Sequence, residues 1–370
     1  KVNQTAVVDI LNTTTMHWTV GSLSQARQDM DTAKSRGRIV FAGGWYEGDD
    51  RELYYSDTID VFDYTLNAFL PPLQMFDARA NTAVCDVENN EIFISGGVSR
   101  YLTTQLYYSD TIDVYDPNTH SMKPRLVLPL MRSHHAAACG DGICMFGGGY
   151  TRGHFTVNEY PHFLNEVNVL NIQEWRAGKT TTMWSNQQLK VARADLSAVY
   201  HEHKICFAGG MSQSGKSGQL DCYFTLEAQW GAWQMSLPRS HPIALALQGV
   251  FVFAAGLANG GTIDGGTMWQ KEGQAMRAQR MELFNGTVLS SDALALSVEE
   301  TAGAATGDKF FFGGGINNQR RVTARVEILQ LQNTIRVAQP PHYRNEYPQW
   351  IPIGELLNES WTIPEDMYRL

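Results

Sequence analysis

The chain has 370 residues, of which 43% are hydrophobic, and its formal net charge is −9 at pH 7. This apolar content can fill a large core, and the negative charge argues against general nucleic-acid binding, so we expect no nucleic-acid partner. No low-complexity linker divides the sequence.

An eleven-residue segment occurs twice. Residues 53–63 read LYYSDTIDVFD and residues 106–116 read LYYSDTIDVYD, so the copies are 53 residues apart and differ at one position. A period near 50 residues with strand-type alternation is typical of a propeller blade rather than a helical solenoid. Weaker copies of the acidic strand lie at residues 8–10, 167–169, 223–225, 281–283 and 326–328.

Two further marks recur with this acidic strand. An apolar run before it ends in two glycines, and an aromatic or apolar residue marks the strand after it. The glycine pairs are Gly43-Gly44, Gly96-Gly97, Gly147-Gly148, Gly209-Gly210 and Gly313-Gly314, and a sixth copy has Ala255 in place of the first glycine. The later mark is Trp18, Phe69, Met122, Trp184 and Trp233.

Together these marks resemble the kelch repeat over roughly residues 7–338. The resemblance implies an all-β propeller whose blades each contain four antiparallel strands around a central channel. The period and the chain length favour seven blades, with residues 7–23 supplying outer strands of a blade that the tail completes. Six blades with an appended N-terminal hairpin is the alternative. We assign residues 1–338 to the propeller, and the Pro-rich residues 339–370 to a tail that completes or packs on the closing blade.

Two segments imitate other structures. Residues 242–258 are the longest apolar stretch, but Gln248 and Gly249 interrupt it where a hairpin turn falls, so we expect two buried strands and no membrane span. Residues 210–217 fit the phosphate-binding pattern G-x4-G-K-S, which functions between a strand and a helix. Strand-type residues follow here instead, so we expect no nucleotide binding.

Four glycosylation sequons begin at Asn3, Asn12, Asn285 and Asn358. Asn12 and Asn285 replace the acidic residue that ends the acidic strand elsewhere, at an exposed turn. They predict a secreted, extracellular glycoprotein. The alternative is that asparagine simply suits turns and that the protein is cytoplasmic.

The chain has five cysteines. Cys139 and Cys144 flank an Asp-Gly turn, the strongest signal for a two-residue hairpin. Facing positions of this kind bring Cβ atoms to about 4.5–5.5 Å, close to what a disulfide needs. We predict a Cys139–Cys144 disulfide, with two free buried cysteines as the alternative. Cys206 and Cys222 lie in neighbouring strands but look offset in register, and the pairing of Cys85, Cys206 and Cys222 stays open.

Strand order places the loops between second and third strands, and the connections between blades, on one face of the ring. We call it the loop face, and the opposite side the turn face. Just before five inner strands an arginine recurs, followed two residues later by a polar residue. The pairs are Arg27 and Asp29, Arg79 and Asn81, Arg132 and His134, Arg193 and Asp195, and Arg239 and His241. We expect all ten at the channel mouth. The arginines either hold loop carbonyls between blades or bind a carboxylate or phosphate group.

The loops of the loop face, at residues 45–52, 150–164, 259–279 and 317–321, differ in length and chemistry. They carry aromatic residues such as Trp45, Tyr150 and Trp269. Variable loops on a rigid frame are where recognition usually takes place, and aromatic residues beside arginine are typical of protein interfaces and of sugar-binding surfaces. The alternative is that these side chains pack the loops themselves.

The sequence therefore predicts a non-enzymatic recognition or assembly protein that binds a protein or glycan through the loop face, without metal or cofactor. The alternative is a secreted carbohydrate-active enzyme, similar to copper radical oxidases or to mutarotases, that uses the channel mouth. No Cys/His cluster has zinc spacing, and His134, His135 and His241 are the candidate histidines of the channel. Propellers have many unrelated functions, so the fold leaves both hypotheses open.

Overall fold

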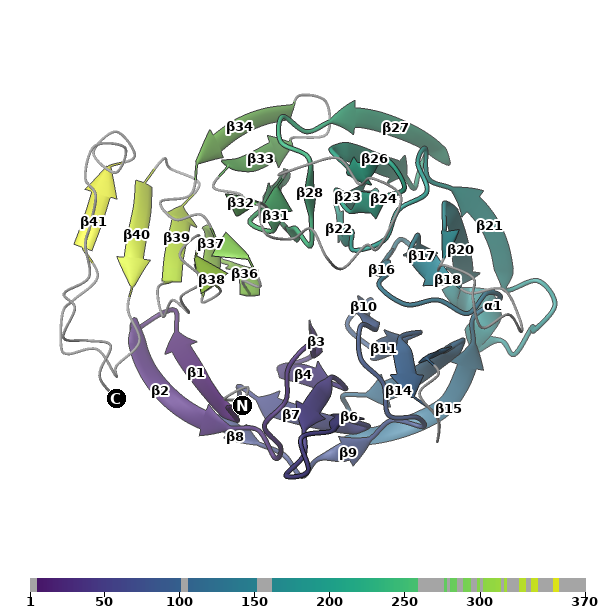
Figure 1. Cartoon of the computed structure of the whole chain (residues 1–370), viewed down its shortest axis with the longest axis horizontal. Coiled ribbons are helices and arrows are strands. Elements are labelled where there is room, and N and C mark those ends of the chain that lie inside the picture. The colour runs from purple at the N-terminus through teal and green to yellow at the C-terminus, as the bar shows by residue number, and fades with distance from the viewer. Residues whose placement is uncertain are drawn as a thin grey trace.

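A computed structural model describes residues 5–100, 106–151 and 162–258 in full. Beyond these it describes 276–277, 280–284, 289–293, 298–299, 302–313, 316–317, 326–330, 334–338 and 349–352. The chain forms a β-propeller of six antiparallel blades arranged around a central axis (Figure 1), and each blade is a sheet of four strands, with a fifth strand in blades 1 and 6.

The first three blades follow one another along the chain. Blade 1 consists of β3 (Asp31–Ser35), β4 (Arg38–Ala42), β7 (Thr58–Asp63) and β8 (Ala68–Phe69), with β9 (Leu73–Gln74) also paired to β7. Blade 2 consists of β10 (Ala83–Val87), β11 (Glu91–Ser95), β14 (Thr111–Asp116) and β15 (Ser121–Val127). Blade 3 consists of β16 (Ala136–Gly140), β17 (Ile143–Gly147), β20 (Glu166–Asn171) and β21 (Trp184–Gln188), with the short helix α1 (Ile172–Arg176) between the last two.

The other three blades repeat this order. Blade 4 consists of β22 (Ser197–His201), β23 (Lys204–Ala208), β26 (Gln219–Phe224) and β27 (Gln229–Gln234). Blade 5 consists of β29 (Ile243–Leu247), β30 (Val250–Ala254), β33 (Arg280–Phe284) and β34 (Leu289–Ala293). Blade 6 consists of β36 (Ala302–Thr306), β37 (Lys309–Gly313), β39 (Val326–Gln330), β40 (Thr334–Ala338) and β41 (Gln349–Pro352).

Short strands extend the blades on the loop face. They are the pairs β5 (Trp45–Glu47) with β6 (Leu53–Tyr55), β12 (Val98–Arg100) with β13 (Leu106–Tyr108), β18 (Tyr150–Thr151) with β19 (His162–Phe163), β24 (Met211–Ser212) with β25 (Gly215–Lys216) and β35 (Val298–Glu299) with β38 (Ile316–Asn317). In blade 5, β28 (Arg239–Ser240), β31 (Leu257–Ala258) and β32 (Met276–Arg277) form a three-stranded sheet.

The core lies between neighbouring blades, because the second strand of each blade is covered on both faces. Ile92 and Ile94 of β11 pack toward blade 1, whereas Phe93 packs toward Cys144 and Phe146 of blade 3. A strand buried on both faces is apolar throughout rather than alternating. The same burial explains why residues 242–258 are mainly apolar, since they form the strands β29 and β30 as predicted. Among the described residues, no helix has the length and apolar character required to cross a membrane.

The preference for seven blades is wrong. The N-terminal strands β1 (Val7–Asn12) and β2 (His17–Ser22) pair with each other as a separate sheet. Leu11 and Trp18 pack against Phe311 and Ile328 of blade 6, so the hairpin lies at the outer rim between blades 6 and 1 (Figure 1). The described part of the tail, β41, pairs with β40 and widens blade 6, so it does not supply inner strands for a seventh blade.

The glycine pairs and the arginines belong to one contact between successive blades. The first glycine of a pair has a positive φ, as at Gly96 (φ +58°) and Gly148 (φ +68°). A Cβ atom there would lie 2.4 Å from the carbonyl oxygen of Arg132, or 2.5 Å from that of Arg193, in the next blade. The following glycine donates its N–H to the same carbonyl, at 2.9 Å for both Gly97 and Gly149. Glycine is needed because another blade's backbone occupies the space of a side chain.

The predicted glycine pair Gly147-Gly148 is wrong by one residue. Gly148 and Gly149 have the positive φ angles that the contact requires. Blade 5 has Ala255 (φ +55°) at the first position. The blade that follows has Val298, four residues before β36, where the other blades have the arginine.

Candidate functional site

The five repeated arginines are buried, and their guanidinium groups lie inside the blades. Four of them form ion pairs with the acidic residue of the third strand. The pairs are Arg27 with Asp60 at 2.7 Å, Arg79 with Asp113 at 2.5 Å, Arg193 with Asp221 at 2.8 Å and Arg239 with Glu282 at 3.8 Å. In blade 3, Arg132 donates to the side-chain oxygen of Asn168, which occupies the acidic position. The ion pairs explain why the repeat contains an acidic residue within an apolar strand.

Other donors of these arginines bind backbone carbonyls, as Arg132 shows most fully. Arg132 donates to the carbonyl oxygens of Phe146 at 3.1 Å and of Gly148 and Glu166 at 3.0 Å. Burial lowers the pKa of Arg132 to about 10, and the nearby Glu166 opposes that change. These contacts fit the hypothesis that the arginines hold backbone carbonyls, rather than the hypothesis that they bind a ligand. Their side chains have almost no surface that a macromolecular partner could contact.

The five polar residues that follow the arginines come two residues before the inner strand of each blade, where the channel mouth was expected. All have φ between 51° and 55°, a region in which Asn, Asp and His are enriched among non-glycine residues. Their backbones link successive blades, since His134 donates its N–H to Asn81 at 3.1 Å, Asp195 to His134 at 2.9 Å and His241 to Asp195 at 2.8 Å. Part of the preference for polar residues here therefore comes from the backbone conformation.

Three of the side chains at the mouth form a polar cluster with Tyr150. Asp195 lies 3.2 Å from Nε2 of His241 and accepts a hydrogen bond of 3.4 Å from the Tyr150 hydroxyl. Burial alone would raise the pKa of Asp195, but His241, His134 and Tyr150 together lower it to about 2. Burial also lowers the pKa of His134 below its usual value. The mouth thus holds a carboxylate beside His241, whose side chain is 56% exposed.

The predicted aromatic residues have different environments. Tyr150 is buried against Tyr108, Ala194 and Phe163, so its ring packs the loop itself. Trp45 is partly exposed, and its indole N–H donates to Asp29 at 2.6 Å, which fixes the ring beside the mouth. Trp269 lies outside the described residues.

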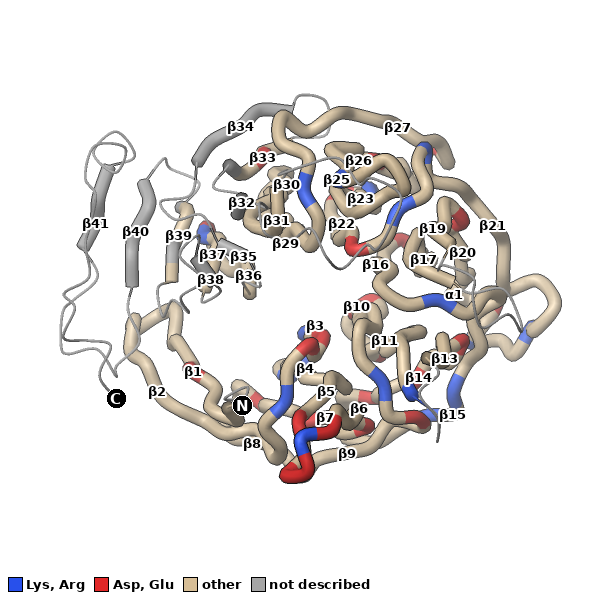
Figure 2. Tube along the Cα trace, in the orientation of Figure 1, with Lys and Arg blue, Asp and Glu red and all other residues tan. Residues whose placement is uncertain are grey.

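Exposed aromatics gather on the loop-face hairpin of blade 1, β5–β6. Tyr46 and Tyr54 stack with their ring centroids 5.6 Å apart, and the Tyr54 hydroxyl donates to Asp50 at 2.6 Å. The hairpin also carries acidic residues, visible beside β5 and β7 in Figure 2. On blade 2, Tyr107 occupies the repeat position of Tyr54, and both are exposed. These tyrosines were not among the candidates, although the repeated Leu-Tyr-Tyr segment contained the signal.

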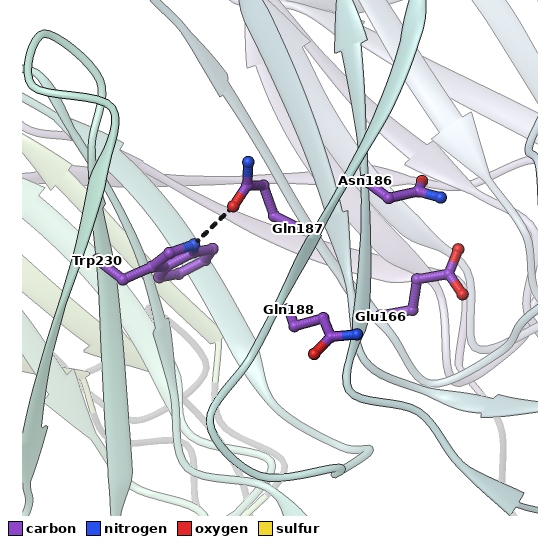
Figure 3. Close-up of a pocket in the computed structure, with 5 residues that line it drawn as sticks. All are labelled: Glu166, Asn186, Gln187, Gln188 and Trp230. Carbon is purple, nitrogen blue, oxygen red and sulfur yellow. Dashed lines mark hydrogen bonds between the residues drawn. The ribbon is translucent and has the colours of Figure 1, made fainter.

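A depression of about 500 Å³ lies on the outer side of blades 3 and 4, and it was not predicted from the sequence. Glu166, Asn186, Gln187, Gln188 and Trp230 line it (Figure 3). The Trp230 indole donates to the side-chain oxygen of Gln187 at 3.2 Å, which holds β27 to β21. The run of three amides on β21 was the available sequence signal.

The Cys139–Cys144 disulfide is confirmed, across the β16–β17 hairpin. Cys206 and Cys222 form a second disulfide. The expectation that these two are offset is wrong, because they face each other directly in the β23–β26 register. Cys85 is a buried free cysteine.

Of the four sequon asparagines, only Asn12 lies within the described residues. It is exposed at the end of β1, and its side-chain oxygen accepts the backbone N–H groups of Thr14 and Thr15 at 3.0 Å. Asn12 thus stabilises its turn, which is the alternative explanation of this asparagine, and its glycosylation stays a prediction. Asn3, Asn285 and Asn358 lie outside the described residues.

Residues 210–217 contain a short β-hairpin. They form the β24–β25 pair, and β26 follows where a phosphate-binding loop would require a helix. The Lys216 ammonium donates to the carbonyl of Ala258 at 3.0 Å.

The comparisons with known proteins support the fold. No family model matches the sequence, and no curated protein matches it. Among solved structures, YjhT, a kelch-type propeller, aligns with a TM-score of 0.62 at 12% sequence identity, over 85% of this chain and 97% of that chain. At this identity the likeness shows the fold alone. The chain is a six-bladed β-propeller that is similar in fold to YjhT.

Proposed function

We propose that this protein is a kelch-type recognition module, without catalytic activity, that binds a protein or glycan through its loop face. The observation that carries the proposal is the exposure of Tyr54 and Tyr107, which occupy equivalent hairpins of neighbouring blades. Stacking on Tyr46 and the hydrogen bond to Asp50 fix the Tyr54 ring before any partner arrives. A fixed aromatic side chain gives contact area at a small entropic cost.

We also propose that the protein acts outside the cell and is glycosylated at Asn12 and Asn285. Two disulfides support an oxidising compartment, because such bonds rarely persist in the cytosol. Asn12 lies in a turn between two strands of a hairpin at the rim, away from Tyr54 and Tyr107. A glycan there would leave the loop face open to a partner.

The second candidate function, a carbohydrate-active enzyme, is favoured by the Asp195–His241 pair at the channel mouth. An ionised carboxylate beside an exposed imidazole can transfer protons to and from sugar hydroxyls. His135 does not contribute, because it is buried and its Nε2 lies 2.9 Å from the Ser95 hydroxyl. If sugar conversion is observed and is lost in an Asp195→Asn variant, the enzymatic candidate replaces the recognition module.

Replacing Tyr54 or Tyr107 with alanine is expected to weaken binding by about 2 kcal/mol or more for whichever residue is a central anchor. A glycan array and a library of extracellular proteins would supply the partner, and surface plasmon resonance would give the affinities. Tyr64→Ala is the matched control, because Tyr64 is 47% exposed against 42% for Tyr54 and lies in the β7–β8 turn on the turn face. Lost binding in Tyr64→Ala, with normal binding in both loop-face variants, would refute the proposal.

A further inference from the structure

The buried thiol of Cys85 lies against a disulfide of the neighbouring blade. Its sulfur is 3.2 Å from the sulfur of Cys139, which is already bonded to Cys144. In the described part of the chain, the sulfur atoms of Cys85, Cys139 and Cys144 all lie within 4.8 Å of one another. Cys85 comes from β10 of blade 2, and the other two come from β16 and β17 of blade 3.

We propose that the three cysteines share one disulfide, which moves between a bond within blade 3 and a bond between blades 2 and 3. Cys85 loses its proton, and its thiolate attacks the sulfur of Cys139. The Cys139–Cys144 bond breaks as the Cys85–Cys139 bond forms, and Cys144 leaves as a thiolate that takes up a proton. One disulfide and one thiol exist before and after the step, so neither an oxidant nor a reductant is consumed.

The geometry supports this exchange. The two sulfurs need to approach by only about 1 Å to reach bonding distance. Cys85 and Cys139 face each other across the interface between blades, within one apolar cluster that includes Val87, Phe93 and Phe146. Because the inner strands of these blades already pack together, the new bond requires only a local movement.

The environment of Cys85 also controls the rate of the exchange. Burial raises the pKa of its thiol above the usual range, and the adjacent Asp86 adds to this effect. Its other neighbours in the cluster are apolar or cysteine side chains. The attacking thiolate is therefore scarce at neutral pH, so the exchange is slow there and accelerates as the pH rises.

The exchange would change the covalent connection between blades. The resting bond joins residues 5 apart in sequence, whereas the exchanged bond joins residues 54 apart. A longer closed loop restricts the unfolded chain more strongly in the chain-entropy model. Because Cys85 is in blade 2 and Cys139 is in blade 3, the exchanged disulfide would also join these two blades covalently.

The test locates the single free thiol of the cluster. The native protein is held at about pH 7 or about pH 9.5, quenched with acid, labelled with N-ethylmaleimide in acidic denaturant and mapped by mass spectrometry. We expect the label on Cys85 at neutral pH, and partly on Cys144 with linked Cys85–Cys139 peptides at alkaline pH. The Cys206–Cys222 bond is the internal control, because it has no third cysteine and should not rearrange. Label confined to Cys85 at alkaline pH would overturn the proposal.

A second variant removes the competing bond. After exposure to oxidised glutathione, Cys144→Ser should contain a Cys85–Cys139 disulfide, found by non-reducing peptide mapping, while its circular dichroism stays that of the wild type. If the folded variant retains two free thiols instead, the sulfurs do not reach bonding distance and the proposal fails. If it does not fold, the labelling of the wild-type protein still decides.

Discussion

Replacing Arg193 with alanine is expected to lower the free energy of unfolding by about 3–5 kcal/mol, because a buried carboxylate loses its counter-charge. Arg193 is inaccessible to solvent and lies 2.8 Å from Asp221, which is itself 3% exposed. The same guanidinium donates to the carbonyls of Val191 and Phe207 at 3.2 Å. The substitution therefore removes several hydrogen bonds at once and leaves an uncompensated charge in the blade.

Urea denaturation of the variant and of two controls would measure this effect. Arg193→Lys keeps the charge but lacks the planar fork of donors, so we expect an intermediate loss. Arg100→Ala removes an exposed arginine at the end of β12 and should change stability by no more than about 0.5 kcal/mol. An Arg193→Ala protein with wild-type stability and lost partner binding would show instead that the arginine ring serves a ligand.

Replacing Gly96 with alanine is expected to cost about 3 kcal/mol or more, since two penalties add. The residue has a φ of +58°, which strains any side chain. Its Cβ atom would also lie 2.4 Å from the carbonyl oxygen of Arg132 and 2.7 Å from the His135 ring. Relieving the clash would require blades 2 and 3 to separate or His135 to give up its contact with Ser95.

Gly307→Ala is the matched control, because Gly307 has a similar φ of +63° and a Cβ atom added to it would meet nothing within 4 Å. The Gly307→Ala variant should lose only the stability that corresponds to backbone strain, about 1 kcal/mol. Thermal unfolding followed by circular dichroism would compare the two variants. Equal losses in both would mean that the contact between blades contributes nothing and that backbone strain alone explains the recurring glycine of the repeat.

The repeated segments determine the local architecture, because each blade is built from contacts that recur at a fixed spacing. The four-stranded antiparallel blades follow from the acidic strand, the glycines and the aromatic position. The Cys139–Cys144 disulfide follows from a two-residue turn that fixes which strand positions face each other. The 242–258 hairpin follows from a single Gln-Gly turn within an apolar run. In each case residues close in the sequence are also close in space.

Contacts between residues far apart in the sequence were decided only by the tertiary structure. The count of six blades depends on where β1, β2 and β41 pack, and their sequences fit the outer strands of either ring. The same arginine spacing fits a ligand site or an internal ion pair, and the choice came from the fold of each blade, which buries Arg79 against Asp113. The pairing of Cys206 with Cys222 depends on the register between β23 and β26, which are separated by a long loop. The approach of Cys85 to Cys139 arises because closing the ring brings together two strands that are 54 residues apart in the sequence.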